Sequence, residues 1–251
     1  MHAAFERSIL LPSSVFPGFP AETLPFLRSL KRNNRREWFQ PRKHLYELHL
    51  KTPMLELVTD LNAELAKFAP EYVSEPKKAI FRIYRDTRFS ADKTPYKTHI
   101  AAYFARRGRG PEPLGTGGFY FSVANEQIEV AGGIYRPPPD VLLLVRTHIA
   151  ENHQELRDIL SDKKTRKLAG GLRGDELQRI PKGFDALHPA ADLIKKKDWI
   201  FDVSLPSSLA TTSKLYREIA DRFRAMTPLI NYLNRPLVAR KPARTGAEYF
   251  S

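Results

Sequence analysis

The segment from Arg82 to Tyr96 concentrates side chains that can bind an anion. It combines guanidinium groups, a lysine, carboxylates and phenols in a stretch that has the pattern of a strand followed by a turn at 90–95. A guanidinium group binds phosphate or carboxylate through paired hydrogen bonds, and a neighbouring carboxylate can hold it in orientation. The candidate anion-binding residues are Arg82, Arg85, Arg88, Lys93 and Tyr96, and the candidate orienting or proton-carrying residues are Asp86 and Tyr84.

Strand alternation makes this hypothesis specific. Successive side chains of a strand point to opposite faces, so Arg82, Tyr84, Asp86 and Arg88 are expected to share one face. We therefore predict that Arg82, Asp86 and Arg88 act as one site for a phosphate- or carboxylate-bearing small molecule. An alternative is that this Arg–Asp–Arg cluster is an internal brace in a structural or partner-binding domain, because a dry core accepts such groups only when every one is paired.

The distribution of charge suggests an anionic partner and leaves its class open. The chain has 251 residues, of which 41 are Lys or Arg and 28 are Asp or Glu, for a net charge of +13. Residues 77–109 carry ten cations and two acids, and residues 28–51 carry eight cations and two acids. A surface made of both basic segments would bind nucleic acid nonspecifically. A deep pocket around Arg82, Asp86 and Arg88 favours the small molecule. A broad exposed cationic face favours nucleic acid if aromatic side chains are uncovered on it, namely Tyr84, Tyr96, Tyr103 or Phe104.

Several other kinds of chemistry are excluded or lack support. The chain has no cysteine, which excludes a disulfide framework, a thiol nucleophile and cysteine-bound metals. His44 and His49 are five residues apart, as are His148 and His153, and this is not the four-residue spacing that places two ligands on one helical face. The glycine-rich stretch at 115–118 lacks the lysine of a phosphate-binding loop. We predict no metal and no cofactor, and whether the protein is an enzyme stays open.

The chain also lacks the usual signals for export or membrane insertion. Its N-terminal residues have neither the positive start nor the apolar core of a signal peptide. The longest apolar run elsewhere, 141–145, is far below the roughly 20 residues that span a bilayer. We therefore expect a cytoplasmic protein without a membrane partner, and the sequence gives no oligomeric state.

The pattern of apolar residues predicts which elements carry the basic segments. Period-two alternation starts at Ala79 and ends before Pro137, between stretches with helical spacing. We predict an α+β fold in which an antiparallel β-meander over about 79–135 packs one face against the helices at 41–68 and 209–233. A single domain would cover 1–238, with residues 1–15 loosely ordered and 239–251 a mobile tail. The expected strands are 79–89, 96–104, 119–124, 128–135 and 199–203, the further expected helices are 21–30, 140–150 and 152–160, the stretch 108–118 is a loop, and 161–198 is left unassigned.

These motifs resemble those of the domain of unknown function 2461 family. The run Arg82-x-x-Arg85-Asp86-x-Arg88-Phe89, followed by Asp92-Lys93 and Tyr96, is similar to the signature of that family. The resemblance covers roughly residues 15–235 and implies a soluble, largely bacterial protein of about this size with no established activity, cofactor or catalytic residue. The other similar segments are Phe16-Pro17-Gly18-Phe19, Asn34-Arg35-Arg36-Glu37-Trp38-Phe39, Gly132-Gly133-Ile134-Tyr135-Arg136-Pro137 and Ile180-Pro181-Lys182-Gly183-Phe184-Asp185.

Overall fold

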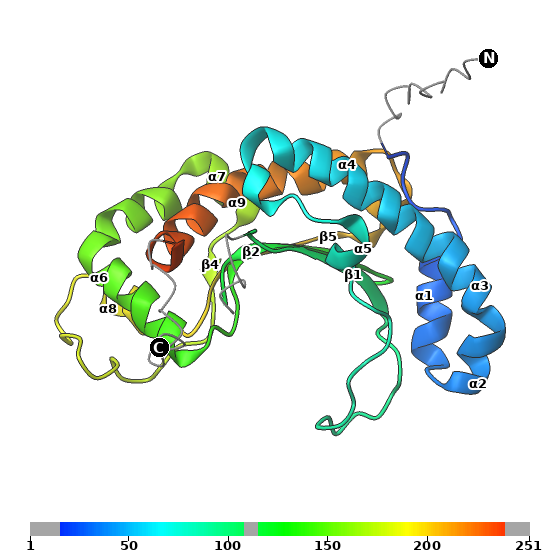
Figure 1. The fold of residues 1–251 in the computed structure, drawn as a ribbon, viewed down its shortest axis with the longest axis horizontal. Coiled ribbons are helices and arrows are strands. Elements are labelled where there is room, and N and C mark those ends of the chain that lie inside the picture. Colours follow the sequence, from blue (N-terminus) through cyan, green and yellow to red (C-terminus); the bar gives the residue numbers. More distant parts are fainter. Residues whose placement is uncertain (1–15, 108–114, 239–251) are drawn as a thin grey trace, which may run out of the picture.

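The computed structural model describes residues 16–107 and 115–238, which form one sheet covered by helices (Figure 1). The strands are β1 (His99–Phe104), β2 (Gly118–Ala124), β3 (Gln127–Ile134), β4 (Leu172–Arg173) and β5 (Trp199–Pro206). The helices are α1 (Thr23–Arg32), α2 (Arg36–Phe39), α3 (Lys43–Tyr46), α4 (Thr52–Phe68), α5 (Pro76–Ala79), α6 (Pro139–Ser161), α7 (Lys163–Ala169), α8 (Ala191–Ile194) and α9 (Lys214–Val238). The predicted tail at 239–251, the segment 1–15 and most of the loop at 108–118 lie outside the described residues.

The sheet is antiparallel, as predicted. Its strand order is β1-β2-β3-β5-β4, and each neighbouring pair runs antiparallel. The expected hairpin around 125–127 joins β2 to β3, and the expected strand at 199 pairs along the whole length of β3. The α+β class is thereby confirmed.

The expected strand at 79–89 is wrong. The described backbone has only two isolated bridges there, Ile80 to Ala102 and Tyr84 to Tyr96. Along the first arm, Ile80 and Tyr84 are four positions apart, whereas their partners Tyr96 and Ala102 are six positions apart. The second arm therefore bulges, and the regular pairing of the two arms is interrupted. Without a regular strand, side chains two positions apart no longer share one face. The predicted common face of Arg82, Tyr84, Asp86 and Arg88 therefore has no basis in the backbone.

The helices cover one face of the sheet and form the core with it. Figure 1 shows α4, α7 and α9 on the same side of the strands. Phe223 of α9 packs its ring against Phe104, Phe119 and Phe121, at centroid distances of 5.7, 4.8 and 6.4 Å. All four side chains are almost completely buried, which accounts for much of the stabilisation of this layer. The predicted packing of the segments 41–68 and 209–233 on one face is confirmed.

A π-helical turn carries the long N-terminal helix past Pro53. Proline has no N–H and clashes with the carbonyl four residues earlier, here that of His49. The backbone widens into a π-helical turn at Glu47–Lys51, so α3 and α4 form one continuous rod without a cap at Thr52. The Thr23 hydroxyl of α1 donates to the His49 carbonyl at 2.6 Å and satisfies the acceptor that Pro53 leaves free.

The later helices also absorb breaks that the sequence signals. The segment 139–161 is two helices joined at Asn152, whose φ and ψ of −130° and 28° are not helical, as the pattern predicts. By contrast, α9 continues through Pro228 without interruption. The unassigned stretch contains α7, β4 and α8. No helix in the described parts of the chain is both long and apolar enough to cross a membrane.

Gly133 allows β3 and β5 to approach closely. Its φ is +136°, a conformation that other residues rarely adopt. A Cβ atom at this position would lie 2.1 Å from the carbonyl oxygen of Trp199. The Gly-Gly pair of the segment 132–137 therefore has a structural explanation.

Candidate functional site

The segment 80–97, which we call the hairpin, lies along the outer edge of β1 and extends beyond the sheet (Figure 1). Its base is fixed to the connection between α1 and α2 by Asn34. The Asn34 amide donates to the Tyr96 carbonyl at 2.8 Å and accepts from the Tyr96 N–H at 3.0 Å, so one side chain replaces a strand partner. The Tyr96 ring, which is 1% exposed, stacks on Phe39 at 4.2 Å. Tyr96 therefore anchors the hairpin through its backbone and its buried ring.

Arg85 closes the hairpin from inside. Its guanidinium donates to Asp92 and to the Thr94 hydroxyl. The Thr94 backbone N–H, and then Arg85, lower the pKa of Asp92 to about 2. Lys93 donates to the Thr87 carbonyl at 2.9 Å and ties the turn from the other side. These hydrogen bonds give Arg85 and Lys93 a structural role in the hairpin.

Asp86 and Arg88 form a pair at the surface. Two hydrogen bonds, of 2.7 and 3.0 Å, join the guanidinium of Arg88 to the carboxylate of Asp86. The side chain of Arg88 is 76% exposed and that of Asp86 is 45% exposed, so the pair is not an internal brace. The hydrogen bonds from Arg88 lower the pKa of Asp86, and the more distant charge of Arg82 contributes less. The structure thus brings Asp86 and Arg88 together, with Arg82 outside their hydrogen bonds.

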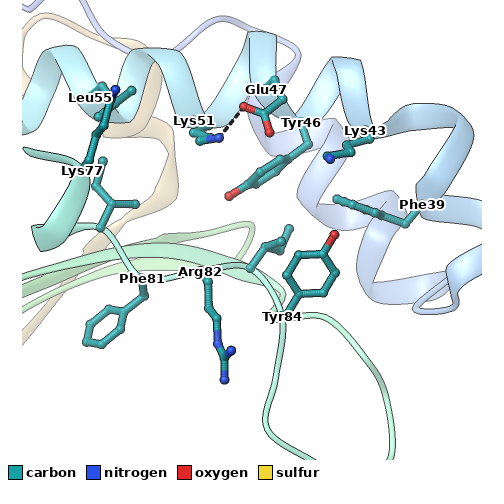
Figure 2. Close-up of a pocket in the computed structure, with 12 residues that line it drawn as sticks. Phe39, Lys43, Tyr46, Glu47, Lys51, Leu55, Lys77, Phe81, Arg82 and Tyr84 are labelled. Atoms are coloured by element: carbon teal, nitrogen blue, oxygen red, sulfur yellow. Dashed lines mark ion pairs between the residues drawn. The ribbon is translucent and has the colours of Figure 1, made fainter.

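The base of the hairpin forms one wall of a cleft. The cleft has a volume of about 520 Å³ and lies between the α3–α4 rod and the segment 77–84. Figure 2 shows Tyr46 and Tyr84 directed into this space from opposite walls, whereas Phe81 and Arg82 point away from it. Tyr84 is therefore a cleft residue, and Arg82 faces the other side of the segment. The cleft is lined by Phe39, Lys43, Tyr46, Glu47, Lys51, Leu55, Lys77, Ile80, Phe81, Arg82, Ile83 and Tyr84.

The cleft joins the two basic segments of the sequence. Lys43 and Lys51 come from the first segment and Lys77 from the second. Glu47, the acidic residue in the lining, is already paired with Lys51 at 2.8 Å. Burial, followed by the charge of Glu47, raises the pKa of Tyr46 to about 12, so its hydroxyl keeps its proton at neutral pH and can donate a hydrogen bond. The cleft thus combines excess positive charge with a neutral donor.

A second group of cations lies on the opposite side of the segment. The ammonium of Lys97 lies 4.7 Å from the centre of the Phe81 ring, an attractive cation–π distance. Partial burial and then the nearby charge of Arg82 lower the pKa of Lys97. Within the described residues, neither the guanidinium of Arg82 nor the ammonium of Lys97 has a hydrogen bond or an ion pair. Arg82 is the candidate residue whose charge stays uncompensated.

Sequence reasoning missed two sets of residues. It did not single out Lys43, Tyr46 and Lys77, which lie in or next to the basic segments but are not distinguished by their spacing. It also missed polar side chains on the sheet face opposite α9, among them Glu129 and Asp202, although strand alternation in 119–135 was a usable signal. In the residues that the structure covers, no group of three or more His, Asp or Glu side chains could hold a metal ion.

Comparison with known proteins gives a family without an assigned activity. A family model described as a conserved hypothetical protein, DUF2461, matches residues 22–232. No curated protein and no solved structure matches the chain. The matched range includes the rod, the hairpin and all five strands, so the match covers every element that forms the cleft. The chain therefore belongs to the DUF2461 family of conserved hypothetical proteins.

Proposed function

We propose that this protein binds a small molecule bearing a phosphate or a carboxylate in the cleft at the base of the hairpin. The observation that carries the proposal is that lysines from both basic segments line one cleft whose acidic residue, Glu47, is already neutralised by Lys51. Like charges held together on the walls of a cleft favour the binding of an anion. We keep a cytoplasmic location as part of the same proposal.

The cleft offers separate contacts to the two halves of such a ligand. Lys43 and Lys77 supply the positive charge, and the Tyr46 hydroxyl supplies a hydrogen-bond donor to an oxygen of the anion. Leu55 and Ile80 line the cleft with apolar surface that suits the organic part. The volume of about 520 Å³ is in the range of sites for small molecules.

Two of the four aromatic residues that nucleic-acid binding would use are buried, whereas Tyr84 is exposed and Tyr103 is half-buried. Tyr96 is 1% exposed and Phe104 is fully buried, so neither offers a face for a base to stack on. Tyr84 is exposed but directed into the cleft. A gel-shift assay across salt concentrations tests this alternative, because neutralising about six phosphates would cost several orders of magnitude in affinity between low and physiological salt. Absence of binding at low salt would remove it.

A thermal-shift screen tests the small-molecule proposal. The probes are inorganic phosphate and a panel of phosphorylated and carboxylated metabolites. A ligand at a hundredfold excess over its Kd stabilises the folded state by about 2.7 kcal/mol, which for a chain of this size raises Tm by about 5 to 10 °C.

The variants place the effect in the cleft. The double variant Lys43→Ala/Lys77→Ala should lose the response, and Lys167→Ala/Lys182→Ala, which removes the same charge from exposed positions that do not line the cleft, should keep it. A panel that leaves the wild-type Tm unchanged, or an equal response from both double variants, would contradict the proposal.

A further inference from the structure

The sheet face opposite the helices carries a cluster of polar side chains. In the observed register Ser122 lies opposite Glu129, and Ala131 lies between Tyr120 and Asp202 on the neighbouring strands. Paired residues of an antiparallel sheet point to the same face, so these side chains share the face that α9 does not cover. His99 of β1 belongs to the same face through its pairing with Ala124. We call His99, Tyr120, Ser122, Glu129 and Asp202 the polar sheet face.

The two carboxylates of the polar sheet face have different environments. Glu129 accepts a hydrogen bond from the Gln127 amide at 3.0 Å and one from the Ser122 hydroxyl at 3.3 Å. The carboxylate of Asp202 lies 3.8 Å from the guanidinium of the exposed Arg173. Burial, and then the charge of Glu129, raise the pKa of Asp202. Glu129 is thus held by two donors, while Asp202 has an exposed cation as its ion-pair partner, and both carboxylates offer acceptor oxygens on the same face.

An aromatic and cationic rim adjoins this pair. The Phe81 ring lies 6.3 Å from the Tyr120 ring and beneath the ammonium of Lys97. Arg82 lies close enough to Lys97 to lower its pKa. The segment that carries Phe81 and Arg82 lies outside β1, so three inter-strand spacings of about 4.8 Å, or about 14 Å, separate its backbone from that of Glu129 on β3. The Phe81 and Tyr120 rings lie within this span, which suits a molecule of sugar size that carries an anionic group at one end.

We propose that the polar sheet face is a second ligand site, which binds a polyhydroxylated small molecule carrying one anionic group, such as a sugar phosphate. Lys97 and Arg82 bind the anionic group. The rings of Phe81 and Tyr120 cover the carbon skeleton, and Glu129 and Asp202 bind its hydroxyl groups. The site is separate from the cleft, because Tyr120, Glu129 and Asp202 do not line the cleft. The side chains of Phe81 and Arg82, which come from its wall, point away from it (Figure 2).

Chemical-shift mapping with named probes tests this site. Glucose 6-phosphate, ribose 5-phosphate and glycerol 3-phosphate are titrated into the ¹⁵N-labelled full chain. At least one of them should perturb the amides of β1, β2, β3 and β5. Glu129→Gln keeps the size and one acceptor of the side chain but removes its charge, and it should weaken binding at least tenfold. Lys97→Met should do the same, while Lys182→Ala, at an exposed position far along the chain, should have no effect.

The outcomes separate this inference from the cleft proposal. Perturbations confined to residues 43–51, abolished by Lys43→Ala/Lys77→Ala and unaffected by Glu129→Gln, would place the ligand in the cleft and overturn the second site. Binding of none of the three probes would also overturn it and would leave the response of the cleft to other anions untouched. If Glu129→Gln does not keep the wild-type Tm, Asp202→Asn replaces it, with the same loss of affinity expected.

Discussion

The attachment of the hairpin through Asn34 can be tested by one substitution. Asn34→Ala removes both hydrogen bonds to the Tyr96 backbone and leaves its N–H and carbonyl without their partner. A net contribution of about 1 kcal/mol per hydrogen bond, with a further cost where the stranded group is buried, gives a loss of about 2 to 3 kcal/mol. For a chain of this size the expected fall in Tm is about 5 to 10 °C.

Urea unfolding measures that loss, and hydrogen exchange locates it. The amides of Tyr96, Arg85 and Lys97 should exchange faster in the variant, because their hydrogen bonds belong to the hairpin base. Asn33→Ala is the matched control, since Asn33 makes only a local hydrogen bond to the Ser29 carbonyl, at 2.9 Å, and should lose less than about 1 kcal/mol. If Asn34→Ala were no more destabilising than this control, the amide would not hold the hairpin and the reasoning would be refuted.

Three other features make predictions about stability. Gly133→Ala should lower the free energy of unfolding in urea by about 3 kcal/mol or more, because Gly133 has a positive φ and an added Cβ would lie 2.1 Å from the β5 backbone. The control Gly171→Ala, where an added Cβ has no atom within 4 Å, should be neutral or stabilising, and equal effects of the two variants would contradict the close approach. Hydrogen bonding from Lys67 and other partners lowers the pKa of Glu64, so the folded state holds this proton less tightly than the unfolded state. The ionised carboxylate therefore stabilises the fold above pH 4.5, and this stabilisation is lost as the pH falls below that value. Thermal melts from pH 3 to 6 should show a weaker pH dependence of Tm in Glu64→Gln, and an unchanged pH dependence would refute this. Arg88→Ala removes a surface pair and should leave Tm within about 1 °C of wild type in thermal unfolding, while a large fall would restore the internal brace.

The sequence predicts those parts of the fold that depend on local patterns. The hairpin of β2 and β3 follows from alternation on both sides of a three-residue polar turn, and the break at Asn152 follows from a capping residue within an apolar repeat. The strand expected at 79–89 fails although Phe81 and Ile83 alternate with polar residues. The arm that pairs with it contains two additional residues between the bridges. This offset becomes visible only when the two arms are paired, so the pattern of either arm alone does not reveal it. The π-helical turn before Pro53 likewise depends on Thr23 of another helix.

The cleft lies at the base of the predicted hairpin, but Lys43, Tyr46 and Lys77 were not among the predicted site residues. The cleft and the polar sheet face both lie against the segment 80–84, inside the basic region that the sequence indicates. Which lysines face the cleft depends on how the rod packs over this segment, because Lys43 and Lys77 do not differ in chemistry from the other lysines of the chain. Composition identifies the charge, and only the tertiary fold determines which charges remain uncompensated.

The presence or absence of a hydrogen-bond or ion-pair partner therefore separates structural residues from candidate ligand-binding residues in this protein. Most of the motif side chains that could do chemistry already have partners: Arg85 has Asp92, Arg88 has Asp86, and the backbone of Tyr96 has Asn34. A guanidinium that already donates to a carboxylate gains less from a new anion, because binding must first replace that interaction. Within the described chain, the charged groups of four side chains have no hydrogen bond or ion pair, and these side chains lie on the two sides of one segment: Lys43, Lys77, Arg82 and Lys97. If this protein binds an anion, the free energy of binding should come mainly from these four cations, and the motif that resembles chemistry in the sequence should act by holding them in place.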